Sequence, residues 1–354
     1  MSRPKVRGWW VWPLVAAAGL LAPWPASTIE RAYSRTIYPL IEAVLTRVTN
    51  VTALAAIDVG LVGLFAWLVW RIASAFSDAR NASVWTALGT LAQRVLRAAG
   101  VLGVAFLCAW GLNYRRVPLE EQLGGQRGQA IDAGLVRQLA AESARSAAAF
   151  RTMRTAPDEP LTLVAARLEA PFQEALRRLG LPPVSVVGRP KHSRILTPFF
   201  TAAGVTGMVN PILLESMVHP DLLPFERPMV LAHEWAHLAG LADEADASAV
   251  GWLACRLAGL DVAYSADFSM LLEAGAALPR AEWRALRLSL PPEVEQDIAA
   301  LTARVSRAQP QVRQTANRVY DGYLRSNRVE DGVRSYSRVV RVAVSPGMRA
   351  ALPR

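Results

Sequence analysis

The sequence contains little histidine and little cysteine. Its 354 residues include four histidines and two cysteines, Cys108 and Cys255. So few cysteines, one of them inside an apolar run, argue against the disulfide framework on which small secreted domains depend. Because histidine is scarce, two of them at a spacing suited to metal binding are unlikely to coincide by accident.

Dense clusters of basic residues are absent as well. The formal net charge is +10, but it comes from 39 Lys and Arg residues scattered along the chain, nearly all of them arginine. Proteins that bind nucleic acid concentrate basic residues and place aromatic residues among them, and no such run occurs here. We therefore expect no nucleic-acid partner.

Apolar residues, in contrast, are plentiful. They make up 52% of the chain, and the mean hydropathy is +0.21, a sign that is unusual for a soluble domain. Three apolar runs, at about 9–26, 53–70 and 95–114, predict three transmembrane helices in residues 1–114. The first follows a basic start and resembles a signal anchor. The lipid bilayer is thus an expected partner.

Individual residues refine these three spans. Asp58 is costly in lipid, so we expect it near the membrane boundary or facing another helix. The third run has an apolar centre of only about 15 residues, short for a span, unless Arg97 extends to the headgroups and Trp110 and Tyr114 anchor the far end. The charge distribution predicts that residues 115 onward are extracytoplasmic.

The segment 29–48 separates the first two apolar runs. Its apolar residues recur at helical spacing, which predicts an amphipathic helix lying on the membrane rather than a further span. The residues on this apolar face are Ile29, Tyr33, Ile37, Leu40, Ile41, Val44 and Val48.

Residues 115–354 predict one mainly α domain with a small β-sheet, an α+β class. Proline and glycine separate the helical patterns, which cover 129–154, 161–179, 279–288, 292–307 and 311–327. Two short β-branched runs, 184–188 and 204–209, predict strands. Lys191 and Arg194 are expected on a solvated strand face.

One stretch, 233-HEWAH-237, carries the chemistry. A helix over Met229–Ala239, ended by Gly240, places His233 and His237 on one face, one turn apart. This spacing lets two imidazole nitrogens bind a single Zn²⁺. Glu234 lies one step around the helix, where it can act as general base on a water without being a ligand.

A catalytic zinc needs a third protein ligand, and 243-DEADAS-248 provides candidates. Asp243 suits the start of a second helix running to about Ala258. Glu244, in the first turn of that helix, can approach the two histidines. Asp243 also fits the spacing of metzincin-like sites, and Asp246 is a third candidate. Spacing alone leaves the three carboxylates open.

The chain resembles a family of bacterial membrane proteins catalogued as a domain of unknown function. The pieces that carry the resemblance are 110-WGLNYRR-116, 188-GRPKHS-193, 223-LPF-225, 233-HEWAHLAG-240, 244-EADAS-248 and 319-VYDGYLRSNRVEDGVRSYSRVV-340. The resemblance implies N-terminal membrane helices followed by a zincin-like domain in the inner membrane. Related gluzincin-type families take the third ligand from a glutamate at the position of Glu244, with Asp or Asn where this chain has Ser248.

The C-terminal match contributes three tyrosines, Tyr320, Tyr323 and Tyr336. One of them is a candidate to donate a hydrogen bond to the oxyanion of a tetrahedral intermediate. Together these features predict a membrane-anchored zinc metallopeptidase with an unknown peptide or protein substrate. A zinc hydrolase of envelope material and a catalytically inactive metal-binding membrane protein are the alternatives.

Overall fold

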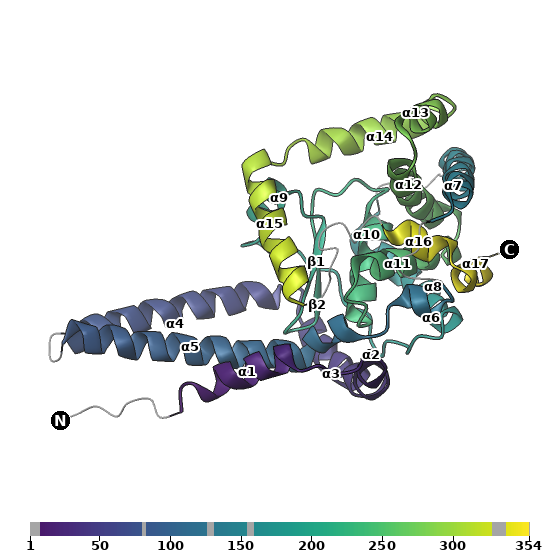
Figure 1. The fold of residues 1–354 in the computed structure, drawn as a ribbon. Coiled ribbons are helices and arrows are strands. Elements are labelled where there is room, and N and C mark those ends of the chain that lie inside the picture. Colours follow the sequence, from purple (N-terminus) through teal and green to yellow (C-terminus); the bar gives the residue numbers. More distant parts are fainter. Residues whose placement is uncertain (1–7, 80–82, 126–130, 154–158, 328–337, 354) are drawn as a thin grey trace.

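The computed structural model describes residues 8–79, 83–125, 131–153, 159–327 and 338–353. A helical globular part makes up most of it, and one long helical hairpin projects from this part (Figure 1). The class is mainly α with a single small sheet, as the sequence predicts.

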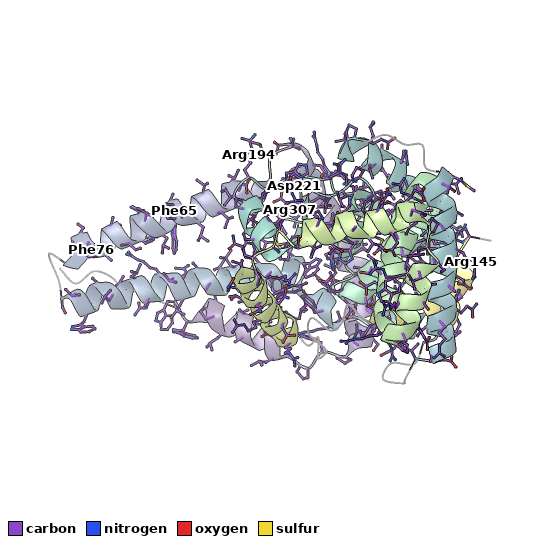
Figure 2. All side chains as sticks on the ribbon, turned by 90° about the horizontal axis from the view of Figure 1, so that it is seen from above. Phe65, Phe76, Arg145, Arg194, Asp221 and Arg307 are labelled. Atoms are coloured by element: carbon purple, nitrogen blue, oxygen red, sulfur yellow. The ribbon has the colours of Figure 1, made fainter. Side chains whose placement is uncertain are left out.

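The hairpin consists of α4 (Ala56–Ala79) and α5 (Val84–Ala109). Within it, Ala56–Ser77 and Val84–Ala109 are long and apolar enough to cross a membrane. At about 1.5 Å per residue each exceeds the roughly 30 Å of a bilayer's hydrocarbon core. Figure 2 shows Phe65 and Phe76 on α4, well outside the globular part.

The first apolar run differs from the prediction. Its helix, α1 (Val11–Leu21), has only 11 residues, about 16 Å, which is too short for a span. It packs against α5 so closely that a Cβ on Gly100 would lie 2.3 Å from the backbone nitrogen of Pro13. The guanidinium of Arg115 donates to the carbonyl oxygens of Gly19 and Ala22 at the end of α1.

The third apolar run also differs in detail. Its helix begins at Val84 rather than near residue 95, so the span does not depend on anchoring by Trp110. Trp110 is 5% exposed and points into the globular part. Asp58 lies in the first turn of α4, where its carboxylate accepts hydrogen bonds from the Ser193 hydroxyl and the Arg194 N–H. It therefore has polar partners at the boundary, as expected.

The segment between the first two runs is helical from Ala26 to Asn50. It comprises α2 (Ala26–Thr28), the π-helix η1 (Ile29–Ile37) and α3 (Tyr38–Asn50). Ile29 and Tyr33 belong to the core of the globular part, together with Tyr38. The core therefore includes residues on both sides of the 114/115 boundary that the sequence suggests.

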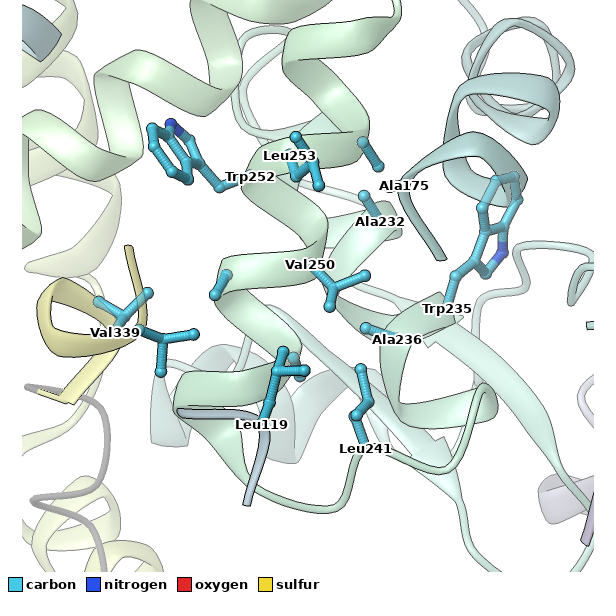
Figure 3. Close-up of a cluster of buried hydrophobic side chains, with 14 of the residues drawn as sticks. Leu119, Ala175, Ala232, Trp235, Ala236, Leu241, Val250, Trp252, Leu253 and Val339 are labelled. Atoms are coloured by element: carbon cyan, nitrogen blue, oxygen red, sulfur yellow. The ribbon is translucent and has the colours of Figure 1, made fainter. Parts of the chain in front are cut away.

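The remaining helices surround α10 (Arg227–Leu238) and α11 (Glu244–Leu257). They are η2 (Gly111–Arg115), α6 (Leu119–Gln122), α7 (Ala133–Met153), α8 (Leu161–Arg178), α9 (Thr197–Ala203), α12 (Leu260–Ala277), α13 (Arg280–Leu288), α14 (Pro292–Val305), α15 (Pro310–Ser326), α16 (Val339–Val344) and α17 (Pro346–Ala351). Figure 3 shows Val250 and Leu253 of α11 at the centre, with Leu119, Trp235 and Val339 packed around them. The helices predicted in this half are confirmed within a few residues.

The sheet has two antiparallel strands, β1 (Gly207–Asn210) and β2 (Glu215–Val218). The predicted strand at 204–209 overlaps β1, but 184–188 is not a strand. That segment passes beneath α10, where the indole of Trp235 donates to the carbonyl of Gly188. Lys191 bridges to β2 and is fully buried beside Glu215, 3.1 Å away, so the expectation of a solvated lysine was wrong.

Candidate metal site

Helix α10 holds both histidines. Pro228 opens it in the first turn, where the missing N–H is harmless, and Gly240 turns the chain after it with a φ of +83°. α11 packs directly against it, and a Cβ on Gly251 would lie 3.0 Å from the backbone nitrogen of His233. This close approach brings the first turn of α11 beside the histidine face of α10.

Three ligand atoms converge at this point. The Nε2 atoms of His233 and His237 lie 3.1 Å apart. Oε2 of Glu244 is 3.1 Å from the first and 3.4 Å from the second. These three residues form a group that could hold a metal ion.

The other ring nitrogens have partners that orient the imidazoles. Nδ1 of His237 lies 2.7 Å from the carbonyl oxygen of Leu241, which can only accept a hydrogen bond. Nδ1 of His233 lies 3.1 Å from the hydroxyl of Ser248. Ser248 thus helps to orient the ring of His233. With protons on Nδ1, both Nε2 atoms present lone pairs.

The other two candidate carboxylates are engaged elsewhere. Asp243 caps the N-terminus of α11 by accepting from the N–H groups of Ala245 and Asp246, and it pairs with Arg338. The Asp246 carboxylate accepts the N–H of Leu119 at 2.9 Å. Glu244 is therefore the acidic residue that faces the histidines.

The arrangement suits a small cation. The two imidazole Nε2 atoms face each other, and among the described residues the buried Oε2 of Glu244 has no hydrogen-bond partner. Ligand atoms about 2.0–2.1 Å from a tetrahedral Zn²⁺ lie about 3.3 Å from one another. The three separations of 3.1, 3.1 and 3.4 Å match that value without rearrangement of the chain.

The electrostatics agree with this donor set. Burial holds the pKa of His233 below its usual value. Burial also acts on His237, but the Glu244 carboxylate outweighs it and raises the His237 pKa to about 9. Burial would raise the pKa of Glu244, yet the two histidines hold it well below its ordinary value. The site thus contains a carboxylate that attracts positive charge.

Glu234 lies outside this trio. It packs against β1, because a Cβ on Gly207 would lie 2.5 Å from its Oε1 atom. Among the described residues its Oε2 atom is buried without a hydrogen-bond partner. Burial raises the pKa of Glu234 to about 8. Glu234 thus follows His233 along α10 but lies outside the trio, and only glycine at 207 leaves room for it.

Of the three tyrosines, Tyr320 reaches the site. Its hydroxyl donates to Oε1 of Glu244, the oxygen that does not face the histidines. Tyr323 stacks on Tyr320 with ring centroids 6.0 Å apart, one step farther from the metal ligands. Burial raises the pKa of Tyr323 to about 12, so it remains a protonated hydroxyl. Tyr336 lies outside the described residues.

Three residues near the membrane hairpin cap the end of α10, and the sequence did not single out this role. The Trp110 indole donates to the carbonyl of His237, the Tyr38 hydroxyl to that of Leu238, and Arg116 to that of Gly240. The last carbonyls of a helix lack partners within it and need such donors. Two of the three, Trp110 and Arg116, lie in 110-WGLNYRR-116, whose aromatic residues suggested a membrane anchor instead.

Comparison with known proteins gives a family but no activity. Searches of the curated proteins and of the solved structures found no match. One family model, described as "Protein of unknown function (DUF3810)", matches residues 33–344. The match begins in η1 and ends in α16, so it includes the hairpin, the sheet and the histidine site. Because it covers most of the 354 residues, the chain belongs to the DUF3810 family.

Proposed function

We propose that the protein is a membrane-anchored, zinc-dependent metallopeptidase. The observation that carries this proposal is the convergence of His233, His237 and Glu244 at ligand-to-ligand distances of 3.1 to 3.4 Å, with Glu234 beside them. Two histidines and a carboxylate on adjacent helices form the donor set of catalytic zinc sites that retain one open position. The zincin-like character of the domain is part of the same proposal.

The chain's own groups have separate tasks in this proposal. His233, His237 and Glu244 hold the ion, and Ser248 and the carbonyl of Leu241 fix the rings. A bound Zn²⁺ supplies Lewis acidity and lowers the pKa of a coordinated water toward about 7. Glu234 takes the proton of the attacking water on its carboxylate and delivers it to the leaving amine. Tyr320 stands nearest to stabilise a developing oxyanion.

The free edge of strand β1 favours a peptide over other hydrolysable compounds as the substrate. It pairs with β2 on one side, and within the described residues no strand pairs with its other side. An extended peptide can add to such an edge by main-chain hydrogen bonds. Glu234 packs against the face of this strand at Gly207, so we expect a peptide added at the edge to run near the proposed base.

The hairpin provides the anchor. If α4 and α5 both cross the bilayer, the start of α4 and the end of α5 lie on one side of it, together with the site. Because α1 is too short to span, sidedness depends on the turn between α4 and α5, which Arg71, Arg80 and Arg94 flank in the sequence. Basic residues favour the cytoplasmic side, so we infer a multi-pass protein of the bacterial inner membrane with its globular part extracytoplasmic. Fusion of a reporter active only outside the cytoplasm after residue 353 tests this sidedness, since a cytoplasmic domain would leave it inactive.

Metal content tests the proposal most directly. The full chain is the right material, because Tyr38 and Trp110 belong to the core around α10. We expect one zinc per chain in detergent-purified wild type and in Glu234→Gln, none in His237→Ala, and cleavage of a peptide library by wild type alone. If folded wild-type protein binds no zinc after reconstitution, the two histidines are packing residues and the proposal is wrong.

The same experiment separates the alternatives. Zinc loading without cleavage of any peptide in the library would favour a hydrolase of envelope material. If the bound zinc coordinates no added ligand and the protein hydrolyses no substrate, the site is closed and inactive. Catalysis requires an open coordination position on the metal.

A further inference from the structure

The helix α3 has its polar side turned toward the protein and its apolar side outward. Glu42, Thr46 and Thr49 are buried against the globular part. On the opposite side Ile37, at the end of η1, is 50% exposed, followed by Leu40 at 68%, Val44 at 58% and Val48 at 63%. A helix on the surface of a soluble protein shows the reverse arrangement. The four residues form one continuous stripe, which we call the outer α3 face.

The lipid bilayer is the occupant that fits the outer α3 face. The stripe continues through the exposed Val51 and Leu54 into α4, whose apolar side chains are exposed as well. α4 begins six residues after α3 ends and is one of the two helices able to cross a membrane. Arg47 is exposed next to Val48, where its guanidinium can extend to lipid phosphates while its stem stays on the apolar side.

The inner side of α3 contacts α10, the helix that carries His233 and His237. The hydroxyl of Tyr38 donates to the carbonyl of Leu238, the residue after His237, at 2.7 Å. A helix with its side chains is about 10–12 Å thick. If the outer α3 face rests on lipid, the metal ligands stand about one helix thickness above the acyl boundary.

Aromatic side chains connect the hairpin with the site. Phe106, near the end of α5, contacts Tyr323 with ring centroids 6.1 Å apart, and Tyr323 stacks on Tyr320 beside Glu244. Trp110, one turn after Phe106, contacts the ring of His237 at 6.2 Å. The side of the site toward the hairpin is thus aromatic. Such a surface suits an apolar segment of a substrate that emerges from the bilayer better than a charged segment.

From these observations we propose that α3 lies in the bilayer surface with its outer face in lipid, and that the site acts on polypeptides anchored in the same membrane, close to their anchor. The second half of this statement rests on the proposed peptidase function; the first half does not. Anchoring enzyme and substrate in one membrane raises their effective concentration without any new contact.

Lipid quenching tests the position of α3 without reference to activity. The full-length protein carries Cys108→Ser, and its remaining Cys255 is fully buried. One added cysteine then replaces Leu40, Val44, Phe65 or Leu288 and carries a fluorophore, in nanodiscs with spin-labelled lipid. Phe65 on α4 is the control within the membrane, and Leu288, 83% exposed on α13, is the control in water. We expect labels at 40 and 44 to be quenched at least half as strongly as that at 65, and the label at 288 not at all.

Two results would overturn this placement. One is quenching at 40 and 44 no stronger than at 288, which would mean that another chain or a second copy covers the outer α3 face. The other is absence of quenching at 65, which would remove the hairpin itself from the membrane.

Matched peptides test the substrate. Each peptide of the library is offered to zinc-loaded protein in nanodiscs, either free or with an acyl anchor a few residues from its end. We expect the anchored forms to be cleaved at least tenfold faster, and Leu40→Glu/Val44→Glu to lose this advantage while cleaving free peptides at the wild-type rate. Equal rates for free and anchored peptides would overturn the substrate class and leave the peptidase standing. Cleavage of neither form would overturn both.

Discussion

The indole N–H of Trp110 donates a hydrogen bond to the backbone carbonyl of His237, 3.1 Å away. Trp110 immediately follows α5, one of the two helices able to span a membrane, and His237 is a proposed metal ligand. The α4–α5 hairpin and α10 are therefore joined by a direct contact. This contact explains why the core cannot be divided at the end of the hairpin.

Replacement of Trp110 by Phe removes the donor and keeps an aromatic ring. The carbonyl of His237 still accepts the N–H of Gly240 but loses the indole hydrogen bond, which contributes about 0.5–1.5 kcal/mol. We expect a lower midpoint of thermal unfolding in detergent and weaker zinc binding. The control is Trp85→Phe at the exposed start of α5. An equal effect of both substitutions would contradict a specific role of the Trp110 contact.

Ser248 is expected to support zinc binding through His233. Its hydroxyl lies 3.1 Å from Nδ1 of that ring, and loss of such a partner typically weakens metal affinity about 10–100-fold. Ser248→Ala should lower the zinc affinity by this amount, as measured by competition with a chelator, and Ser248→Asn should restore it. Unchanged affinity in Ser248→Ala would show that the ring is held by its packing alone.

The identity of the third ligand can be tested by three substitutions. Glu244→Ala should lower zinc affinity more than about 100-fold, since it removes a ligand rather than a supporting group. Asp243→Asn keeps the helix cap, because asparagine caps as well as aspartate, and should retain zinc. Asp246→Asn should retain zinc too. Loss of zinc in Asp243→Asn with retention in Glu244→Ala would favour a metzincin-like ligand set.

How much of this site the sequence predicts depends on whether the partners are close along the chain. His233, Glu234 and His237 lie within five positions, so helical spacing was enough to group them, whereas only the family resemblance favoured Glu244 over Asp243 and Asp246. Asp243 and Asp246 could be set aside only with the structure, because Arg338 and the Leu119 N–H come from distant segments.

The elements of the fold were likewise predictable where their signals are close along the chain. Helix patterns bounded by proline and glycine were predicted within a few residues, since their signals are local. Strand β2 was missed because its first residue, Glu215, looks unsuited to a buried strand. Its charge is balanced by Lys191, 24 positions earlier, and its oxygens accept the N–H groups of Ala56 and Ile57 at the start of α4. No local pattern reveals such partners.

Gly207→Ala tests the position of Glu234. The new Cβ would lie 2.5 Å from Oε1 of Glu234, so the carboxylate must move. Small displacements of a catalytic group cost about 100-fold in rate. We expect kcat to fall by about that factor while zinc content stays at the wild-type level. Gly322→Ala on α15 is the control, because its Cβ meets no atom within 4 Å. Parallel loss of zinc would instead indicate general disruption of the site.

Glu42 predicts a pH dependence of stability that is separate from the metal. It is buried on the inner side of α3, where burial outweighs the hydrogen bonds that Thr46 and Ser185 offer to its carboxylate. Burial raises its pKa from 4.5 to about 7. The native state therefore holds its proton more tightly than the unfolded chain. Stability from this group is complete below about pH 4.5 and is lost as the pH rises through 7.

Glu42→Gln keeps the shape and removes the titration. From the difference between the two pKa values, we expect wild type to be about 3 kcal/mol less stable than the variant at pH 8, and the two to be similar at pH 4.5. Thermal unfolding in detergent at both pH values measures the difference between the proteins, so other titrating groups cancel. A constant difference across the range would mean that Glu42 is charged throughout. In that case a cationic partner, rather than a proton, would balance the inner side of α3.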